Sequence, residues 1–275
     1  MNYKNREKII AHSIFLLGSL IVLYPFFSIL FLALSEPGKR ISGFTVPSGF
    51  YFDNFMKAWT DGGFSNGLFN SFIVVVGVVS VTIFCSTLAA YAFEKLDIFG
   101  VTPLFALLLI GLVLPYESIV ISLYYTMKAY NLTNTYWALI LPQIGLSIPF
   151  SIFWLRASFK AIPISLSEAA MIEGAGRITI LTKILMPQMI PAILTLTVLL
   201  FMWTWNEFLL ALIMIQDAEM RTAPLALSYF AGNKRYGDPA ITAAAAIWVA
   251  LPVLIMYIFL QRRFISGMVT GAVKE

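Results

Sequence analysis

Two carboxylates lie within long apolar stretches of the sequence, where an ionisable side chain is costly and is therefore a candidate for function. Glu117 comes two residues after Pro115, and Glu207 directly follows Trp205 and Asn206. An aromatic ring can stack on the C–H face of a sugar, while amide and carboxylate groups can hydrogen-bond to hydroxyls. Glu117, Trp205, Asn206 and Glu207 are therefore predicted to line a path for a polar solute.

A second interpretation of these residues is structural. Polar groups inside membranes commonly hydrogen-bond to one another, so Asn206 and Glu207 can hold neighbouring helices together. We favour this interpretation because such pairing is the common case. In a third interpretation, Glu117 and Glu207 bind a proton or a sodium ion, as in an ion-coupled carrier.

The sequence contains no constellation for catalysis or for holding a metal ion. Its one histidine, His12, and its one cysteine, Cys85, cannot form a catalytic triad, a metal cluster or a disulfide within the chain. A phosphate-binding loop of the form G-x-x-x-x-G-K-[ST] is also absent, because the pair Gly38–Lys39 lacks the upstream glycine. We therefore expect no catalytic residue, no metal site and no cofactor in this chain, and we predict that it is not an enzyme.

The composition is that of a membrane protein. Hydrophobic residues make up 60% of the 275 residues and charged residues only 12%, whereas soluble domains have about 25% charged residues. The net charge of +4 is spread over short connecting segments and forms no basic patch or stripe. Nucleic acid is therefore not an expected partner.

Six apolar runs are long enough to cross a bilayer, which takes roughly 20 residues per helix. They cover approximately residues 9–34, 68–93, 103–127, 135–159, 189–215 and 241–260. The first exceeds the about 7–15 apolar residues of a signal peptide, so it is predicted to remain as an anchor. Six spans put both termini on one side, and that side holds more lysine and arginine, which predicts cytoplasmic termini.

The longest segment on the predicted inner side runs from about residue 160 to residue 188. Ser165 followed by Glu168 matches a capping box, which marks a helix start. Gly174 is placed to end that helix in the left-handed conformation. A helix of about two turns is unstable alone in water, so it must pack against its own membrane domain or a partner. The structural alternative is an elbow on the membrane surface, with Glu168 serving only as a cap.

This loop resembles the EAA loop of the permeases of ABC importers. The matching residues, in order, are Pro163, Glu168, Ala169, Ala170, Gly174 and the run Ile184–Pro187. Met186 stands where the family usually has leucine, a conservative departure. Three further stretches resemble binding-protein-dependent carbohydrate permeases of the MalG-like group, namely Asn70–Gly100, Thr204–Leu212 and the tail Gly267–Glu275.

The resemblance implies a fold and a division of the chain. The implied fold is all-α, with six transmembrane helices in the type I ABC importer permease arrangement and a cytoplasmic coupling helix. Residues 1–66 would comprise an N-terminal tail, the first span and the first outer loop. Residues 67–261 would form the transmembrane core, with the EAA loop at 160–188. Residues 262–275 would form a cytoplasmic tail.

The resemblance also implies partners for named residues. Glu168, Ala169, Ala170 and Gly174 would couple the chain to a cytoplasmic ATPase. The tail near Gly271 and Lys274 would reach between two such ATPases, which use ATP and Mg.

Further implied partners are a second, different permease subunit and an external sugar-binding protein, contacted by the outer loop at 216–239. The implied function is import of a sugar or oligosaccharide across a prokaryotic cell membrane. A different solute, such as a polyamine or phosphate, stays open as the alternative.

Overall fold

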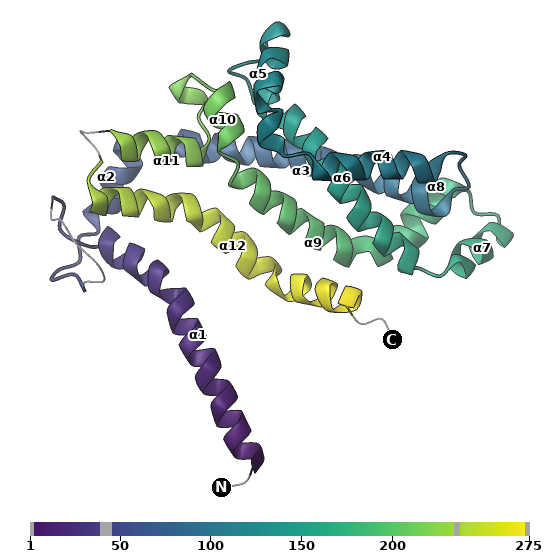
Figure 1. Cartoon of the computed structure of the whole chain (residues 1–275), viewed down its shortest axis with the longest axis horizontal. Helices are drawn as coiled ribbons and strands as arrows, with labels where there is room; N and C mark the ends of the chain where they lie inside the picture. Colours follow the sequence, from purple (N-terminus) through teal and green to yellow (C-terminus); the bar gives the residue numbers. More distant parts are fainter. Residues whose placement is uncertain (1–2, 39–45, 234–236, 273–275) are drawn as a thin grey trace. The chain divides into compact units, whose positions relative to one another are not determined.

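The computed structural model describes residues 3–38, 46–233 and 237–272, and every regular element in these ranges is helical (Figure 1). The elements are α1 (Tyr3–Ala33), α2 (Asp53–Gly62), α3 (Phe64–Lys95), α4 (Val101–Val113), η1 (Tyr116–Ser118), α5 (Val120–Ala129), α6 (Tyr136–Ala161), α7 (Ile164–Ile172), α8 (Arg177–Thr179), η2 (Ile180–Leu185), α9 (Met186–Trp205), α10 (Leu209–Met214), η3 (Ala218–Met220), α11 (Ala223–Gly232) and α12 (Pro239–Ala272). The predicted all-α class is confirmed.

Five helical stretches are long and apolar enough to cross a membrane. They lie at Glu7–Ala33, Phe64–Lys95, Tyr136–Ala161, Arg177–Trp205 and Pro239–Phe259. The first, second, third and fifth of these agree with predicted spans to within a few residues. Long uncharged runs predict such helices well, because a run of this length rarely occurs in any other kind of structure.

The third predicted span, residues 103–127, is wrong as a single helix. Helix α4 ends at Val113, Leu114 and Pro115 are extended with ψ of 124° and 117°, and α5 begins at Val120. Proline disfavours the helical conformation of the residue before it, so Leu114 leaves the helix. The segment therefore forms two shorter helices joined by the 3-10 turn η1.

The fifth predicted span, residues 189–215, is displaced. The long helix runs from Arg177 to Trp205, and α10 follows after a break. Its first turns include the π-helical segment η2, which ends at Leu185, two residues before Pro187. Proline lacks an N–H and its ring clashes with the preceding turn, and a wider π turn accommodates both defects. The helix therefore starts earlier than the hydrophobic run indicates.

The chain divides into two compact units. One consists of residues 1–65 and 226–251, and the other of residues 66–225 and 252–275. In the first unit, the indole N–H of Trp248 in α12 donates to the carbonyl of Phe55 in α2 at 3.1 Å.

The core of the second unit lies where α3, α5, α6 and α10 meet. Its buried residues are Val74, Val78, Val120, Met127, Ala138, Leu139, Ile140, Leu210, Ala211, Met214, Ile215 and Leu225. A Cβ on Gly77 of α3 would lie 2.9 Å from Ile140 Cδ1 of α6. A glycine therefore lets these two helices approach closely, as small residues do in membrane proteins.

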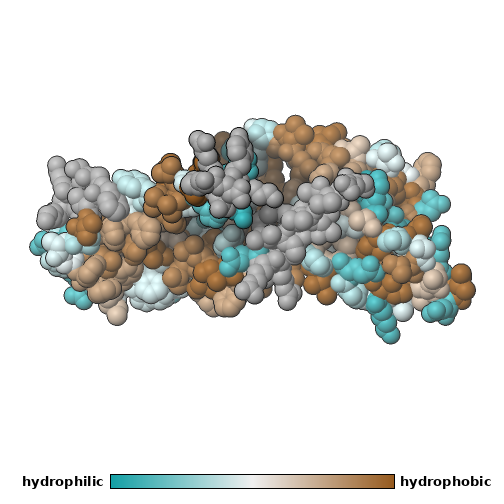
Figure 2. Space-filling model, turned by 90° about the horizontal axis from the view of Figure 1, so that it is seen from below, coloured by the Kyte–Doolittle hydropathy of each residue, from teal (hydrophilic) through white to brown (hydrophobic). Residues whose placement is uncertain are grey.

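Large apolar side chains remain on the outside of the long helices. Within its most apolar 18-residue window, α1 has no buried residue. On the face shown in Figure 2, hydrophobic areas (brown) lie beside polar ones (teal). Apolar surface of this extent belongs against lipid or against other membrane helices rather than in water.

Candidate functional site

The short helix α7 begins before the predicted capping box. Its first residue is Ile164, and Pro163 is its N-cap, with no side-chain hydrogen bond at this end. Ser165 already lies in the first turn, so the predicted cap formed by Ser165 and Glu168 is wrong. The reason is Pro163, whose fixed φ and missing N–H suit it to a helix start. Glu168, which is exposed, is therefore not occupied in capping its own helix.

The end of α7 is as predicted. Gly174 has φ of +83°, in the left-handed region. The N–H of Ala175 donates to the carbonyl of Ala170 at 2.9 Å, and the N–H of Gly174 donates to that of Met171 at 3.0 Å. These two bonds form a Schellman motif, which satisfies carbonyls left over at a helix end. The predicted glycine stop is confirmed.

One face of α7 packs on the protein and the other is open. Ser167 and Ala170 are buried, and the helix contacts η2. Four large apolar side chains are exposed, the most open of them 88% exposed, namely Ile164, Leu166, Met171 and Ile172. Glu168 and Ala169 are exposed with them. Ile164, Met171 and Ile172 fall on one side of the helix together with Glu168, at about 100° per residue, and exposed apolar side chains grouped in this way indicate a surface for a partner.

Helix α3 holds the α7 loop on both sides. The ammonium group of Lys95 donates to the carbonyl of Ile162, just before α7, at 2.7 Å. The hydroxyl of Tyr91 donates to the carbonyl of Arg177, just after the loop, at 3.3 Å. Both donors lie in the last turns of α3. A displacement of α7 would therefore be transmitted to α3.

An ion pair joins the C-terminal parts of α3 and α6. Arg156 Nε of α6 donates to Glu94 Oε2 of α3 at 2.8 Å, with the two side chains 28% and 16% exposed. The Arg156 guanidinium also lies 4.2 Å from the ring centroid of Phe105 in α4. A largely buried, hydrogen-bonded ion pair is strongly coupled, because removing one partner strands the other charge.

Replacing Glu94 by alanine is expected to lower the free energy of unfolding by about 2 kcal/mol, the scale of a hydrogen bond to a charged group. Thermal unfolding of the purified chain in detergent measures this. Lys160→Ala is the matched control, because Lys160 is an exposed cation one turn further along α6. Equal losses of stability in the two variants would refute the role of the ion pair.

An open cavity of about 710 Å³ lies among α4, η1, α6 and α9. Its lining is mostly apolar. The polar lining residues are Tyr116, Gln143, Ser147, Thr204, Asn206 and Glu207. The ring of Trp203 also lines it and contacts Phe150 edge-on, with centroids 4.9 Å apart. Aromatic faces beside amide and hydroxyl groups suit a solute with both C–H faces and hydroxyls.

The Glu207 carboxylate is held by three donors. Its Oε1 accepts from the Tyr116 hydroxyl at 2.8 Å and from the backbone N–H of Leu210 at 2.9 Å. Its Oε2 accepts from the N–H of Ala211 at 3.3 Å. The carboxylate thus joins η1 to the first turn of α10, whose N–H groups lack helical partners.

The cavity brings together only part of the predicted set. Asn206 and Glu207 line it, and the Asn206 amide also donates to the carbonyl of Met202 at 2.8 Å. Trp205 is buried and stacks on Phe201, and exposed Glu117 does not line this cavity.

Four polar residues of the cavity lining were not predicted from the sequence, namely Tyr116, Gln143, Ser147 and Thr204, and two of them follow a proline. Tyr116 directly follows Pro115, and Gln143 directly follows Pro142. A polar residue beside a proline within an apolar run is therefore the signal that could have found both.

The N-terminal end of α3 anchors part of the predicted outer loop at 216–239. The Asn70 amide donates to the carbonyls of Glu219 and Arg221 at 2.7 and 3.0 Å. Its oxygen accepts from the Tyr136 hydroxyl of α6 at 2.7 Å. One amide side chain therefore fixes this segment to two membrane helices.

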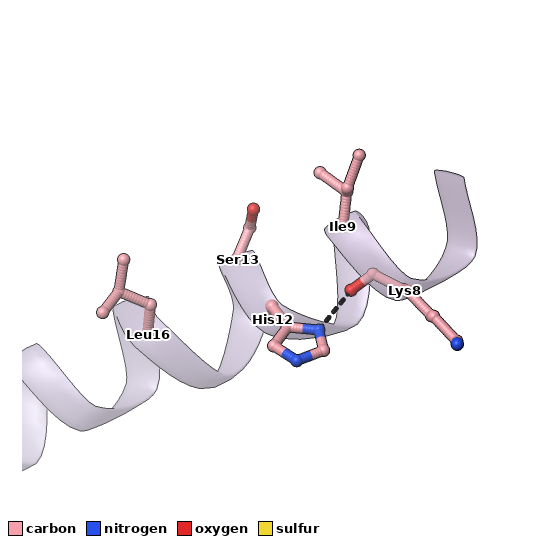
Figure 3. Close-up of a pocket in the computed structure, with 5 residues that line it drawn as sticks. All are labelled: Lys8, Ile9, His12, Ser13 and Leu16. Carbon is pink, nitrogen blue, oxygen red and sulfur yellow. Dashed lines mark hydrogen bonds between the residues drawn. The ribbon is translucent and has the colours of Figure 1, made fainter. Parts of the chain in front are cut away.

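Two further regions hold residues named in the sequence analysis. In the tail, Gly271 lies in the last turn of α12, and Lys274 lies outside the described residues. Near the start of the chain, a shallow depression is lined by side chains of α1 alone, and His12 Nδ1 lies 2.6 Å from the Lys8 carbonyl in the same helix (Figure 3).

Comparison with known proteins places this geometry in a family. The model of the family described as "Binding-protein-dependent transport system inner membrane component" matches residues 5–268. A similar protein is the sulfoquinovosyl glycerol transport system permease protein SmoH of Agrobacterium fabrum, 34% identical over 97% of this chain and 93% of that protein. Another is the trehalose transport system permease protein SugB of Mycobacterium tuberculosis, 31% identical over 94% and 96%.

The trehalose/maltose transport system permease protein MalG of Thermococcus litoralis is 30% identical over 98% of this chain and 99% of that protein. Among solved structures, a chain of a bacterial ABC transporter involved in the import of alginate superimposes with a TM-score of 0.79, at 21% identity and over 96% of this chain and 99% of that chain. This likeness confirms the predicted importer permease fold.

Proposed function

The chain belongs to the family of binding-protein-dependent transport system inner membrane components, and we propose that it is the permease subunit of an ATP-driven sugar importer. The observation that carries the proposal is α7. This helix ends at a left-handed glycine, exposes apolar side chains, and is fastened to α3 on both sides. Such a helix suits the transmission of force from a partner into the membrane helices.

The partner at α7 is a cytoplasmic ATPase in this proposal. Ile164, Met171 and Ile172, which share one side of α7 with Glu168, would fill a cleft of the ATPase, with Glu168 free to bind its polar rim. Glu168, Ala169, Ala170 and Gly174 are then the coupling residues. ATP and Mg are bound by two such partner subunits, and this chain supplies no catalytic residue.

The solute is a sugar or oligosaccharide in this proposal. Trp203, Asn206 and Gln143 line the cavity with an aromatic face and two amides, which suit C–H faces and hydroxyls. The names of the relatives SugB and MalG mention trehalose and maltose, which agrees with this chemistry.

The remaining assembly follows from the same proposal. A second, different permease completes the pathway, and an external binding protein delivers the sugar to the side where Asn70 anchors residues 219–221. The basic bias of the loops then places both termini in the cytoplasm of a prokaryotic cell.

An ion-coupled carrier finds less support. It needs carboxylates available to an ion, but Glu207 already accepts three hydrogen bonds and Glu117 does not line the cavity. A permease of the same family for a polyamine or phosphate differs from the proposal only in solute.

The proposal that partner subunits, and not this chain, hydrolyse ATP can be tested directly. The purified chain alone should hydrolyse no ATP, whereas the complex captured with it from its own cells should do so, faster when a sugar-loaded binding protein is added. Turnover by the chain alone would refute the partner model. Cells lacking the chain should lose uptake of one sugar and keep phosphate and polyamine uptake; the reverse pattern would refute the sugar assignment.

A further inference from the structure

Three large apolar side chains around the start of α2 remain exposed and have no role in the proposed function. We call Phe50, Phe52 and Met56 the α2 stripe; they are 66%, 68% and 67% exposed. The rings of Phe50 and Phe52 lie near each other, with centroids 6.3 Å apart. An exposed cluster of this kind is a surface for something apolar.

Helix α2 has three distinct sides. At about 100° per residue, Phe52 and Met56 fall on one side, which half-buried Phe55 and Trp59 extend. A second side, with Asn54 and Ala58, is buried. A third carries only polar, exposed side chains, namely Asp53, Lys57, Thr60 and Asp61. Adjacent apolar and polar faces on one short helix are the pattern of a helix at a boundary between lipid and water.

The start of α2 is fixed to the end of α1. The Asn54 amide donates to the carbonyls of Ala33 and Ser35 at 2.9 and 2.8 Å, and the N–H of Tyr51 donates to that of Leu34 at 3.0 Å. These bonds satisfy carbonyls at the C-terminus of α1. The level of the α2 stripe in the membrane is therefore set by where α1 ends.

That level is the bilayer surface. Charged residues occur in α1 only up to Lys8, so its apolar part starts at Ile9. The helix from Ile9 to Ala33 is about 37 Å long at 1.5 Å per residue, while the hydrocarbon core is about 30 Å thick. The apolar part of α1 is therefore long enough to cross the hydrocarbon even when tilted, which puts Ala33 at its boundary with the lipid headgroups.

Two tryptophans, one in α2 and one in α12, lie beside each other in this region. The rings of Trp59 and Trp248 lie with centroids 4.9 Å apart, and the Trp248 N–H donates to the Phe55 carbonyl at 3.1 Å. Tryptophan is enriched where membrane helices meet water, because its ring is apolar and its N–H needs a partner. The aromatic pair and the α2 stripe therefore belong to one interfacial band.

We propose that α2 is an interfacial anchor whose apolar stripe inserts among the lipids of the leaflet in which α1 ends. The partner is the lipid surface itself. The stripe continues the apolar surface of α1 past its last turn, while Asp53, Lys57 and Asp61 face the water. The anchor fixes the height of α1. It does not depend on the identity of the transported solute.

Environment-sensitive labels test this in the full chain. With Cys85 replaced by alanine, single cysteines are introduced as Phe52→Cys and Met56→Cys, with Lys57→Cys and Asp61→Cys as controls on the polar side. Each is labelled with a nitrobenzoxadiazole group, and the chain is placed in phospholipid nanodiscs. Quenching by doxyl-labelled lipid and by aqueous iodide is then compared. All four positions are exposed in the chain, and an unchanged thermal unfolding midpoint verifies each fold.

The expected result is a blue-shifted emission at positions 52 and 56, with a ratio of lipid to iodide quenching several-fold higher than at 57 and 61. Equal iodide quenching at all four positions would put the stripe in water and overturn the proposal. Protection of 52 and 56 from both quenchers would show that protein covers them and would also overturn it. So would iodide quenching that disappears only when the external binding protein is added.

Discussion

Substitution of Gly174 by valine is expected to reduce the amount of ATPase that copurifies with this chain by about tenfold. Gly174 has φ of +83°, a conformation that costs a residue with a Cβ roughly 1–2 kcal/mol, and a β-branched one more. An energy of 1.4 kcal/mol corresponds to a factor of ten in an equilibrium constant. Valine would therefore open the Schellman turn and change the direction of α7 relative to η2.

The neighbouring glycine is a matched control for this result. Gly176 has φ of −71°, and a Cβ there would meet no atom within 4 Å. Gly176→Val adds the same bulk two residues away without backbone strain, so it should keep most of the ATPase bound. Similar copurification of both variants with the ATPase, together with normal uptake, would show that the end of α7 does not determine coupling.

Uptake measurements separate a local defect from general misfolding. The Gly174→Val chain should still insert and purify at the wild-type level, because α7 contributes only Ser167 and Ala170 to the buried interior. It should lose transport in proportion to the lost ATPase. A variant that binds the ATPase normally but fails to transport would instead place the defect in the transmission from α7 to α3.

The end of α7 could be predicted from the sequence and its start could not, for a physical reason. A glycine between a helical run and a polar segment indicates a left-handed stop, because few other residues adopt that conformation. A serine and a glutamate three residues apart form a cap only if the helix begins at the serine. Pro163 starts the helix earlier, and the sequence pattern alone does not rank these two signals.

The membrane spans show the same limit. Hydrophobicity locates α1, α3, α6 and α12, because a run of about 20 uncharged residues rarely forms anything other than a membrane-spanning helix. Hydrophobicity does not indicate the break at Pro115, since the residues on both sides of it are equally apolar. The wider turn before Pro187 likewise moves the start of the fifth helix without any change in hydrophobicity.

The candidate site was predicted in part. The sequence marks Glu207 as an unusual residue, but its partner Tyr116 lies 91 positions away and is brought close by the break at Pro115. The remaining acid, Glu117, is adjacent to Tyr116 in sequence yet lies outside the cavity lining. The same local sequence thus supplies one partner of Glu207 and one exposed acid, and only the path of the backbone distinguishes them.

That distinction leads to a second expected result, in which Glu207→Ala destabilises the chain and Glu117→Ala does not. Alanine at 207 strands the Tyr116 hydroxyl and the N–H groups of Leu210 and Ala211, and stranded donors cost about 1–3 kcal/mol each when buried. Because the cavity is open, water can satisfy part of this loss, and we expect a total of about 2 kcal/mol. Exposed substitutions usually stay within about 0.5 kcal/mol.

A double-mutant cycle on thermal unfolding in detergent assigns the loss. If the hydrogen bond is the cause, Tyr116→Phe should lower the free energy of unfolding in the wild-type background and hardly at all in the Glu207→Ala background. The expected coupling energy is about 1 kcal/mol. Additive losses would show that the two side chains act independently.

Glu207→Gln decides between holding helices together and moving an ion. The amide oxygen can still accept the two shorter bonds, from the Tyr116 hydroxyl and the N–H of Leu210, and only the 3.3 Å bond from the N–H of Ala211 is lost. The amide carries no charge and cannot take up a proton. A residue that joins η1 to α10 through its oxygens therefore tolerates glutamine, and sugar uptake should persist at every pH tested. Loss of uptake in Glu207→Gln at unchanged stability would mean that the charge itself is needed. The ion-coupled interpretation would then be restored against the hydrogen bonds that now argue for a structural role.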